Sequence, residues 1–509
     1  MHNKIKLTLI PSGKIMEAER GASLQDILFD CGMEFPCGGQ VRCKCCLIKV
    51  LKGNLPVTEE QKKNLSEKEI SSGWRLACCC KIYEDVTVEL PQLGAVFLSD
   101  NSTFSFEPKE GFAVVFDLGT TTIVAQLVDL INGQISGVRT ALNLQSKYGS
   151  DVMSRVQTAL NKTGLKKLCS IIRKQIGEMT AELISNLKSD SLQKTSVFIV
   201  GNTVMHHLFC GIDVEPLSHY PFVPVDAGMQ VFRADKLDWK LPDATEVRFL
   251  PCIGSFVGSD ILAGIAATKI DKAKKLTGLI DLGTNGEIVF GNEKKILCAS
   301  TAAGPAFEGA HISAGMRADA GAVYKIAVKD GKFICQVIGG VSPRGICGSG
   351  LVDAVAAGIE LGFINENGSL SGNNNEIEIC PNVSITGKDI RELQLAKGAV
   401  YAGIRILLER LNAKIEDVDK IYLAGAFGNY VDCYNAWRIG LFDFPVKKIV
   451  SAGNTALLGA KMIAFSANSE NETYSEIINI TEHVSLNSDL GFQNVFVESL
   501  SFPKNRMLK

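Results

Sequence analysis

Residues Phe112–Asp129 read FAVVFDLGTTTIVAQLVD, an apolar strand, a polar turn and a second apolar strand. A tight turn with glycine and threonine at its tip offers backbone N–H groups and hydroxyls to an anion. Asp117, at the end of the first strand, can hold a hydrated Mg²⁺, which takes one or two carboxylates together with phosphate oxygens. The pattern predicts a phosphate-binding hairpin whose binding residues are Gly119, Thr120, Thr121 and Thr122.

The same pattern returns at Gly278–Phe290, GLIDLGTNGEIVF, with Asp281 in the place of Asp117. Two ordinary hairpins are the alternative interpretation, but an internal repeat favours a duplicated architecture. Two such hairpins facing each other would hold the phosphates of a nucleotide from both sides. The second set of candidate binding residues is Gly283, Thr284, Asn285 and Gly286, and Glu287 joins the two aspartates as a candidate catalytic acid.

Neither turn is a P-loop. The sequence G-x-x-x-x-G-K-[ST] is absent, and both turns lead into strands, whereas Walker and Rossmann glycines open a helix. A further apolar strand, within Asp419–Gly428, runs into Gly425 and Gly428, which would let a base or ribose approach the backbone closely. This strand resembles Ser196–Asn202 of the first half, which supports two related lobes.

Eight of the sixteen cysteines lie within the first 80 residues. In a reducing compartment, clustered thiols suggest metal ligation more than disulfides. A glycine-bearing loop carries Cys37, Cys43 and Cys46, and the distant sequence RLAC ends at Cys78. Three thiolates in one loop plus a distant fourth form the Cys₄ pattern of a [2Fe–2S] cluster. Zinc is the rival metal, although structural zinc sites prefer two short Cys-x2–4-Cys pairs and only one is present. Cys79 and Cys80 leave the choice of the fourth ligand open, with Cys78 preferred.

The segment from residue 1 to about 91 resembles the plant-type and adrenodoxin-like ferredoxins, which have a β-grasp fold. The resemblance is carried by CGG at 37–39, by the Cys43-x2-Cys46 pair, by the strand Leu47–Val50 and by RLAC. Val41 and Lys44 stand where that family usually has glycines. We therefore expect a ferredoxin-like domain over 1–93, a linker over 94–111 and a second domain over 112–509.

Composition describes an ordinary globular protein of 509 residues, with 46% hydrophobic residues and a net charge of −2. This charge creates no global field toward nucleic acid or an anionic membrane. No apolar run reaches the roughly 18 residues that a spanning helix needs, and the N-terminus lacks a signal-peptide core. We expect a cytoplasmic protein with no nucleic-acid or membrane partner. Within 112–509 the lobes should divide near residue 270, and Pro216–Pro251, rich in proline and aromatic residues, should be irregular.

DLGTTT, DLGTNGE, LAGAFG and SAGNTALLGA together resemble the acetate and sugar kinase, heat-shock cognate and actin superfamily. Its members are two-lobed ATP-binding clamps with a duplicated, ribonuclease H-like α/β fold. Behind an N-terminal [2Fe–2S] domain, this body is similar specifically to the ATP-dependent reductive activators of corrinoid proteins. Three further segments carry that resemblance: TAAGPAFEGAHISAGMRA at 301–318, PRGICGSGLVDAV at 343–355 and FQNVFVESLSFP at 492–503.

The resemblance implies an enzyme that reduces inactive Co(II) to Co(I) in a corrinoid protein by one electron, in support of methyl transfer. The implied cofactors are a [2Fe–2S] cluster, ATP and Mg²⁺. The implied partners are the corrinoid protein of a methyltransferase system and an upstream low-potential electron donor. A homodimer is compatible with the sequence, which does not fix the oligomeric state. Three alternatives remain: an electron donor to a 2-hydroxyacyl-CoA dehydratase, a small-molecule kinase with a regulatory cluster, and a redox-sensing ATP-dependent module without turnover.

Overall fold

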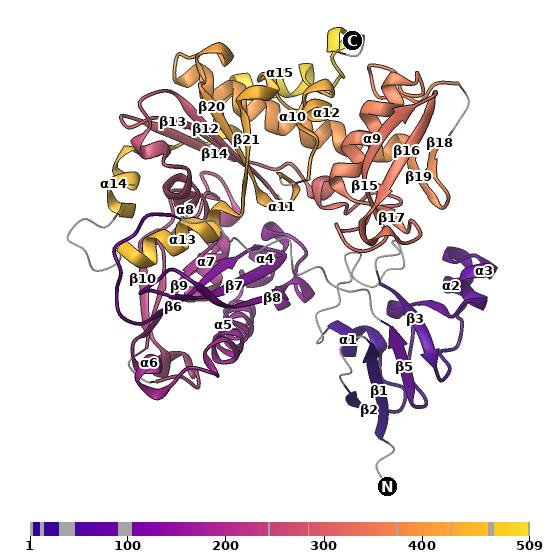
Figure 1. Ribbon diagram of the computed structural model, residues 1–509, viewed down its shortest axis with the longest axis horizontal. Coiled ribbons are helices and arrows are strands. Elements are labelled where there is room, and N and C mark those ends of the chain that lie inside the picture. Colours follow the sequence, from indigo (N-terminus) through magenta and orange to yellow (C-terminus); the bar gives the residue numbers. More distant parts are fainter. Residues whose placement is uncertain are drawn as a thin grey trace.

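The computed structural model describes residues 4–10, 15–29, 46–89, 104–242, 245–283, 285–372, 375–428, 430–466 and 473–506. Figure 1 shows a small N-terminal domain in indigo beside a larger body of two stacked lobes. The lower lobe is built mainly from the first half of the chain, and the upper lobe from the second half. This arrangement confirms the expected α/β architecture of a ferredoxin-like domain followed by a two-lobed, actin-like body.

The described N-terminal residues form a five-stranded mixed sheet in the order β2-β1-β5-β3-β4. The strand β1 alternates between the exposed lysines or the half-buried Thr8 and the buried residues Ile5, Leu7 and Leu9, as one buried sheet face requires. The sheet and its short helices comprise β1 (Lys4–Ile10), β2 (Ile15–Glu19), α1 (Leu24–Phe29), β3 (Leu47–Lys52), α2 (Glu59–Asn64), α3 (Glu67–Ser71), β4 (Trp74–Leu76), η1 (Ala77–Cys79) and β5 (Val86–Glu89).

Lobe 1 is centred on a sheet ordered β10-β11-β9-β6-β7-β8 in the described chain. The hairpin β6–β7 is antiparallel, and β9 runs parallel to β6 on its other side. Its strands are β6 (Phe112–Leu118), β7 (Thr122–Asp129), β8 (Ile135–Leu142), β9 (Thr195–Val200), β10 (Gln230–Arg233) and β11 (Glu246–Phe249). Its helices are α4 (Val152–Ala159), α5 (Lys162–Ile184), α6 (Ser189–Gln193) and α7 (Thr203–Cys210).

The expectation of an irregular Pro216–Pro251 was wrong in part, because β10 and β11 lie inside it and extend the sheet. Val247 and Phe249 are fully buried and alternate with half-buried Glu246 and Arg248, which gives β11 the period of a strand. The surrounding prolines hid this short alternation.

Lobe 2 repeats this topology, with the described strands ordered β21-β20-β12-β13-β14-β22. The strands β12, β13 and β14 pair antiparallel in sequence. On the other side of β12, the strand β20 runs parallel to it, and β21 runs parallel to β20. Asp281 pairs with Ala424 of β20 as Asp117 pairs with Val200 of β9, so the two aspartates occupy equivalent places. The strands are β12 (Thr277–Leu282), β13 (Gly286–Gly291), β14 (Ile296–Thr301), β20 (Lys420–Ala424), β21 (Ile449–Gly453) and β22 (Thr481–His483).

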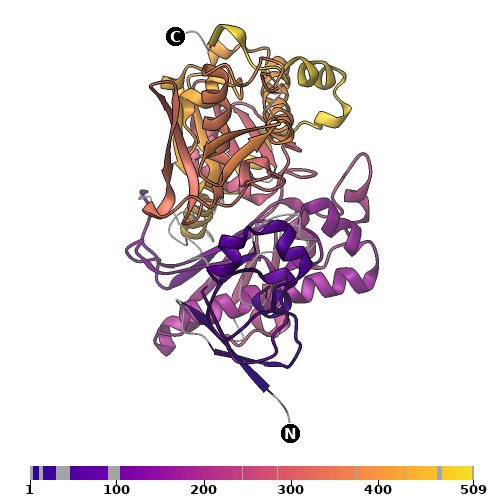
Figure 2. The ribbon, with the colours of Figure 1, turned by 90° about the vertical axis from the view of Figure 1, so that its right-hand side faces the viewer.

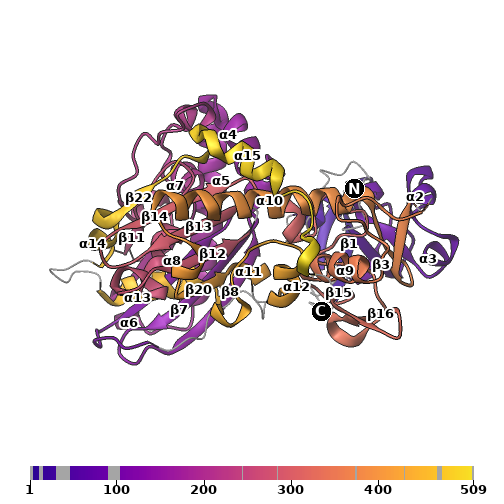
Figure 3. The same ribbon diagram turned by 90° about the horizontal axis from the view of Figure 1, so that it is seen from above.

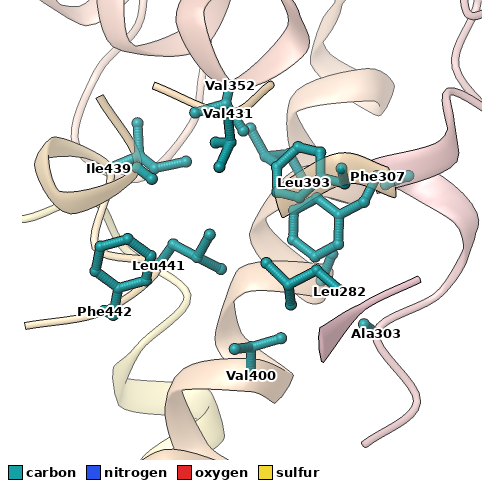
Figure 4. Packing of buried hydrophobic residues seen from close by; sticks show 14 of the residues in the cluster. Leu282, Ala303, Phe307, Val352, Leu393, Val400, Val431, Ile439, Leu441 and Phe442 are labelled. Atoms are coloured by element: carbon teal, nitrogen blue, oxygen red, sulfur yellow. The ribbon is translucent and has the colours of Figure 1, made fainter. Parts of the chain in front are cut away.

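Lobe 2 carries an added layer in which α9, the small sheets and α12 pack beside the main sheet (Figure 1). Seen from above, α10 runs along the lobe with α15 next to it (Figure 3). Figure 4 shows the hydrophobic core of this lobe, where Leu282, Phe307, Val400 and Leu441 point toward one another. The added elements are β15 (Ala322–Lys329), β16 (Lys332–Val337), β17 (Gly345–Ile346), α9 (Gly348–Glu360), β18 (Glu376–Cys380), β19 (Val383–Thr386), α10 (Gly387–Arg410), α12 (Cys433–Arg438) and α15 (Leu490–Glu498).

Two helices join the lobes by crossing over. Helix α8 (Ser259–Thr268) precedes β12 and packs on the lobe 2 sheet, against Leu279 and Val289. Helix α13 (Thr455–Ser466) follows β21 and packs on the lobe 1 sheet, against Val115 and Phe198. The two helices lie against each other so closely that a Cβ on Gly459 would overlap the carbonyl oxygen of Ala263. Helix α14 (Thr473–Ile480) completes this region, and no helix among the described residues is long and apolar enough to cross a membrane.

Candidate functional site

Four carboxyl groups gather between the two hairpins. Asp117 and Asp281 end the first strands of the two lobes, Glu287 pairs with Asp281 across the second hairpin, and Asp260 lies in the first turn of α8. All four are half-buried. Burial raises the pKa of Asp117 to about 6, and burial with the charge of Asp117 raises the pKa of Asp281 to about 7. Burial and the neighbouring acids also raise the pKa values of Asp260 and Glu287. A cation placed among these carboxyls would relieve their mutual repulsion.

Asp260 was not among the predicted site residues. Its carboxyl is close enough to Asp117 and Asp281 for their charges to raise its pKa. The sequence around it, GSDILAG, reads as an ordinary apolar helix start, and its only signal is an acid in a first helical turn just before the second hairpin. The fold makes it a site residue by crossing α8 over to the lobe 2 sheet.

Asn454 orients Asp117. Its Nδ2 donates a hydrogen bond of 2.9 Å to Asp117 Oδ2, while its Oδ1 accepts from the backbone N–H of Leu457 at the start of α13. This hydrogen bond lowers the pKa of Asp117 and so partly offsets the effect of burial. The motif SAGNTALLGA was predicted as part of the fold, but this role of Asn454 was not.

The turn of the first hairpin is fixed by donors from lobe 1. Gly119 N–H donates to the carbonyl of Thr122 over 3.1 Å, and a Cβ on Gly119 would come 2.5 Å from that same oxygen. Asn143 donates from its Nδ2 to the carbonyl of Gly119 and from its backbone N–H to that of Thr121, each over 2.9 Å. Asn202 Nδ2 donates to Thr120 Oγ1 over 3.0 Å. The protein itself therefore sets the shape of the loop.

A buried arginine stands behind this loop. The guanidinium of Arg155 is completely buried and donates to the carbonyls of Thr120 and Gly149. Burial lowers its pKa to about 9, and the charge of Asp151 offsets this only partly. At neutral pH it keeps a positive charge behind the first hairpin, which favours an anion there.

The second hairpin is closed by a hydrogen bond from Gly283 N–H to the carbonyl of Asn285 over 3.0 Å. Ser300 Oγ donates to Glu287 over 3.3 Å, and Thr301 Oγ1 donates to the carbonyl of Gly286 over 3.1 Å. The remaining predicted residue of this turn, Thr284, lies outside the described residues.

The two glycines predicted beside adenosine differ in position. Gly425 opens the short helix α11 (Gly425–Gly428) at a φ of +85° and lies so close to Asp281 that a Cβ would come 2.5 Å from its Oδ1. Only glycine fits there, because other residues rarely adopt this backbone conformation and a side chain would strike the carboxyl. Gly428 instead packs against Leu423 of the preceding strand. Gly425 thus borders the four carboxyl groups directly. Gly428 does not contact them and is connected to them only through the short helix α11, which contains both glycines.

Two of the predicted cluster ligands lie together in the described structure. The Sγ atoms of Cys46 and Cys78 are 3.3 Å apart. Cys37 and Cys43, in the preceding loop, lie outside the described residues. Cys80 is buried, donates from its Sγ to the carbonyl of Leu76 and accepts from Gln61, as a core thiol would. Cys79 Sγ lies 3.9 Å from Cys78 Sγ. Two thiols as close as Cys46 and Cys78 fit two ligands of one metal centre.

No three His, Cys, Asp or Glu side chains in the described parts of the chain are arranged as a complete metal site. For the cysteines, two of the four predicted ligands fall outside those parts. For the carboxyls, a Mg²⁺ ion would need further oxygens, which nucleotide phosphates can supply.

Comparison with protein families divides the chain in the same order as its fold. Residues 7–83 match the 2Fe-2S iron-sulfur cluster binding domain. Residues 112–273 match the RACo middle region, and residues 275–509 match the C-terminal domain of RACo, described as the ASKHA domain.

Individual relatives match over most of their length. The corrinoid activation enzyme RamQ of Eubacterium limosum is 33% identical over 449 residues, which are 81% of this chain and 75% of that protein. A [Co(II) methylated amine-specific corrinoid protein] reductase of Methanosarcina barkeri is 27% identical, over 77% of each chain. The solved structure of a reductive activator for corrinoid,iron-sulfur protein covers 98% of both chains at 26% identity, with a TM-score of 0.69.

Proposed function

The chain belongs to the family of ATP-dependent reductive activators of corrinoid proteins, and we propose that it uses ATP to drive the one-electron reduction of Co(II) to Co(I) in a partner corrinoid protein. One observation carries this proposal. A single chain joins two facing phosphate hairpins, with Asp117 and Asp281 at equivalent places, to a domain in which Cys46 and Cys78 approach within 3.3 Å.

In the proposed activity Cys37, Cys43, Cys46 and Cys78 hold the [2Fe–2S] cluster, which when bound supplies one-electron transfer. Cys80 stays a core thiol in this proposal, since its Sγ donates to the carbonyl of Leu76 and accepts from Gln61. An upstream low-potential donor must return the electron that each turnover removes.

The two hairpins hold the triphosphate in this proposal. Asp117 and Asp281 bind Mg²⁺ or orient the attacking water, and Asn454 keeps the Asp117 carboxyl in place. Burial raises the pKa values of Asp117 and Asp281, and of Asp260 and Glu287, in the absence of a cation, so Mg²⁺ bound among them would favour their ionised forms. The buried charge of Arg155 attracts the phosphates to the first hairpin.

In this proposal ATP is needed because the cobalt acceptor lies at a lower potential than the cluster, so that the electron transfer is uphill. A plant-type cluster has a potential of about −400 mV, and each further 100 mV costs about 2.3 kcal/mol per electron. A clamp whose nucleotide-bound state binds Co(II) corrinoid protein differently can shift that equilibrium, by no more than the difference in affinity between its states. The kinase alternative would require a base beside a substrate hydroxyl, and it is disfavoured because the chain is similar to corrinoid activators over most of its length.

The test mixes cluster-reconstituted protein, Mg-ATP, a reductant and a Co(II) corrinoid protein, and follows the absorption of Co(I). We expect the Co(I) band only when ATP and the cluster are both present. Omitting ATP and replacing Asp117 with Asn should each suppress it. A band of equal size without ATP would contradict the proposal.

A further inference from the structure

The end of β8 and the turn η3 (Leu144–Lys147) lie between the first hairpin and the N-terminal domain. Three successive residues there face two different parts of the molecule. Leu142 and Leu144 pack into the hydrophobic core of the N-terminal domain, whereas Asn143 hydrogen-bonds the phosphate hairpin. Figure 2, which faces the N-terminal domain, shows its indigo strands in front of the magenta elements of lobe 1.

On the side of the N-terminal domain, Leu142 is 6% exposed and belongs to the cluster that contains Cys46, Leu76 and Ala77. Lys147 Nζ lies 3.7 Å from Asp26 of α1, and α1 packs on η1, which carries Cys78. The lobe 1 segment therefore contributes to the same core that positions two of the cluster ligands.

On the side of the hairpin, Asn143 binds both the carbonyl of Gly119 and that of Thr121 over 2.9 Å. The segment cannot absorb a movement of the hairpin by bending, because Gln175 of α5 holds its backbone on both sides of Asn143. Gln175 Nε2 donates to the carbonyl of Leu142, and its Oε1 accepts from the N–H of Leu144. Asn143 Oδ1 also accepts from Gln145 N–H and caps η3.

The N-terminal domain also contacts lobe 2. The guanidinium of Arg344 lies over the ring of Trp74, 5.1 Å from its centroid, and Trp74 begins the strand that leads to Cys78. One small domain therefore touches both lobes of the clamp. A change in the angle between the lobes must alter at least one of these two contacts.

From these contacts we propose that residues 142–144 couple nucleotide binding to the position of the iron–sulfur domain on lobe 1, with Asn143 as the positioning residue. Nucleotide phosphates at Gly119–Thr122 fix the hairpin, the hairpin fixes Asn143, and Leu142 and Leu144 transmit its position to the domain that holds the cluster. The inference rests on the proposed function, since it takes ATP to bind at this hairpin. Coupling of this kind is reciprocal, so a change in how the N-terminal domain packs on lobe 1 must also change the nucleotide affinity.

The experiment measures hydrogen–deuterium exchange of the full-length, cluster-reconstituted protein with and without a non-hydrolysable ATP analogue. We expect the analogue to slow exchange in α1 and in β4 of the wild-type protein. The variant Leu144→Asp places a charge in the domain core and should abolish that response in α1. Its affinity for the analogue, measured by calorimetry, should change by a factor on the order of 10, as coupled sites typically show.

The matched control is Leu490→Asp, the same substitution at a side chain that is 94% exposed on α15. It should leave the exchange response and the affinity at wild-type values. If Leu144→Asp proves unstable, Lys147→Asp removes the pairing with Asp26 from the surface, and the double variant with Asp26→Lys should restore the response. This exchange of charges leaves the core intact.

Three results would overturn the inference. A wild-type protein that binds the analogue with no change of exchange in the N-terminal domain shows that the two sites are uncoupled and leaves the proposed function intact. A response in Leu144→Asp equal to that of the wild type assigns the coupling to another contact. A wild-type protein that does not bind the analogue refutes the proposed function and this inference with it.

Discussion

Asn454 donates a hydrogen bond of 2.9 Å to Asp117, a residue 337 positions earlier in the chain. It stands where β21 of lobe 2 passes into α13, which covers the sheet of lobe 1. One side chain therefore ties the acid of the first hairpin to the helix that crosses between the lobes.

Replacing Asn454 with Ala should shift the pH dependence of ATP hydrolysis. The hydrogen bond lowers the pKa of Asp117, whose value is about 6, so its loss raises that pKa further. Because Mg²⁺ binding needs the ionised carboxylate, the acidic limb of the kcat/KM profile should move to higher pH. Asn494→Ala, an exposed position on α15, is the control and should leave the profile unchanged. An unshifted limb in Asn454→Ala would show that Asp117 does not govern it.

Replacing Asp260 with Asn should stabilise the nucleotide-free protein and impair ATP hydrolysis. Burial and the charges of Asp117 and Asp281 raise the pKa of Asp260, so its ionisation opposes folding. A carboxyl with a raised folded-state pKa contributes stability that is complete below its unfolded-state pKa of about 4 and is lost as the pH rises through its folded-state pKa. For Asp260 that value is about 7, which places the loss between about pH 4 and pH 7.

Thermal unfolding without nucleotide or Mg²⁺ should therefore show a falling Tm across that range in the wild type. Asp260→Asn should weaken the fall and raise Tm at pH 8 by at least about 2 °C. Asp330→Asn, on an exposed turn, is the control. Equal Tm profiles for wild type and Asp260→Asn would contradict the acidic cluster as described.

Replacing Cys46 and replacing Cys80 should have different effects on the cluster, because the two thiols have different contacts. Cys46→Ser should abolish the [2Fe–2S] absorption, because Cys46 Sγ lies 3.3 Å from Cys78 Sγ. Cys80→Ser should retain the cluster at some cost in stability, since that thiol bonds only to Leu76 and Gln61 in the described contacts. Visible and electron paramagnetic resonance spectra after anaerobic reconstitution, with iron and zinc analysis, test this. A cluster in Cys46→Ser, or zinc in place of iron, would refute the ligand assignment.

The local patterns of the sequence were sufficient for the two hairpins and for their equivalence. Asp117 and Asp281 end apolar strands before a glycine turn, and strand period and turn chemistry are properties of neighbouring residues. The duplicated sheet follows from the same repeat, because equal local patterns build equal strand orders.

The contributions of Asp260 and Asn454 could not be predicted in this way. Each becomes part of the site because its helix crosses to the opposite lobe, and such a crossing leaves no periodic signal near the residue. Arg155 is a similar case: a single arginine in a helical segment reads as a surface charge, yet the fold buries it behind Thr120.

The close packing of α8 against α13 predicts that a larger residue at the crossing will impair both stability and activity. A Cβ on Gly459 would overlap the backbone of Ala263, which cannot give way as a flexible side chain could. Gly459→Ala should therefore force the helices apart, lower the stability by about 1–3 kcal/mol and reduce ATP hydrolysis, because the two helices carry Asp260 and Asn454 into the site. Gly387→Ala, at the start of α10 with no atom within 4 Å of the added Cβ, is the matched control and should leave both quantities near wild type. Denaturant unfolding gives the stability, and phosphate release gives the hydrolysis rate. A Gly459→Ala protein as stable and as active as the control would show that the lobes do not depend on close packing at this crossing.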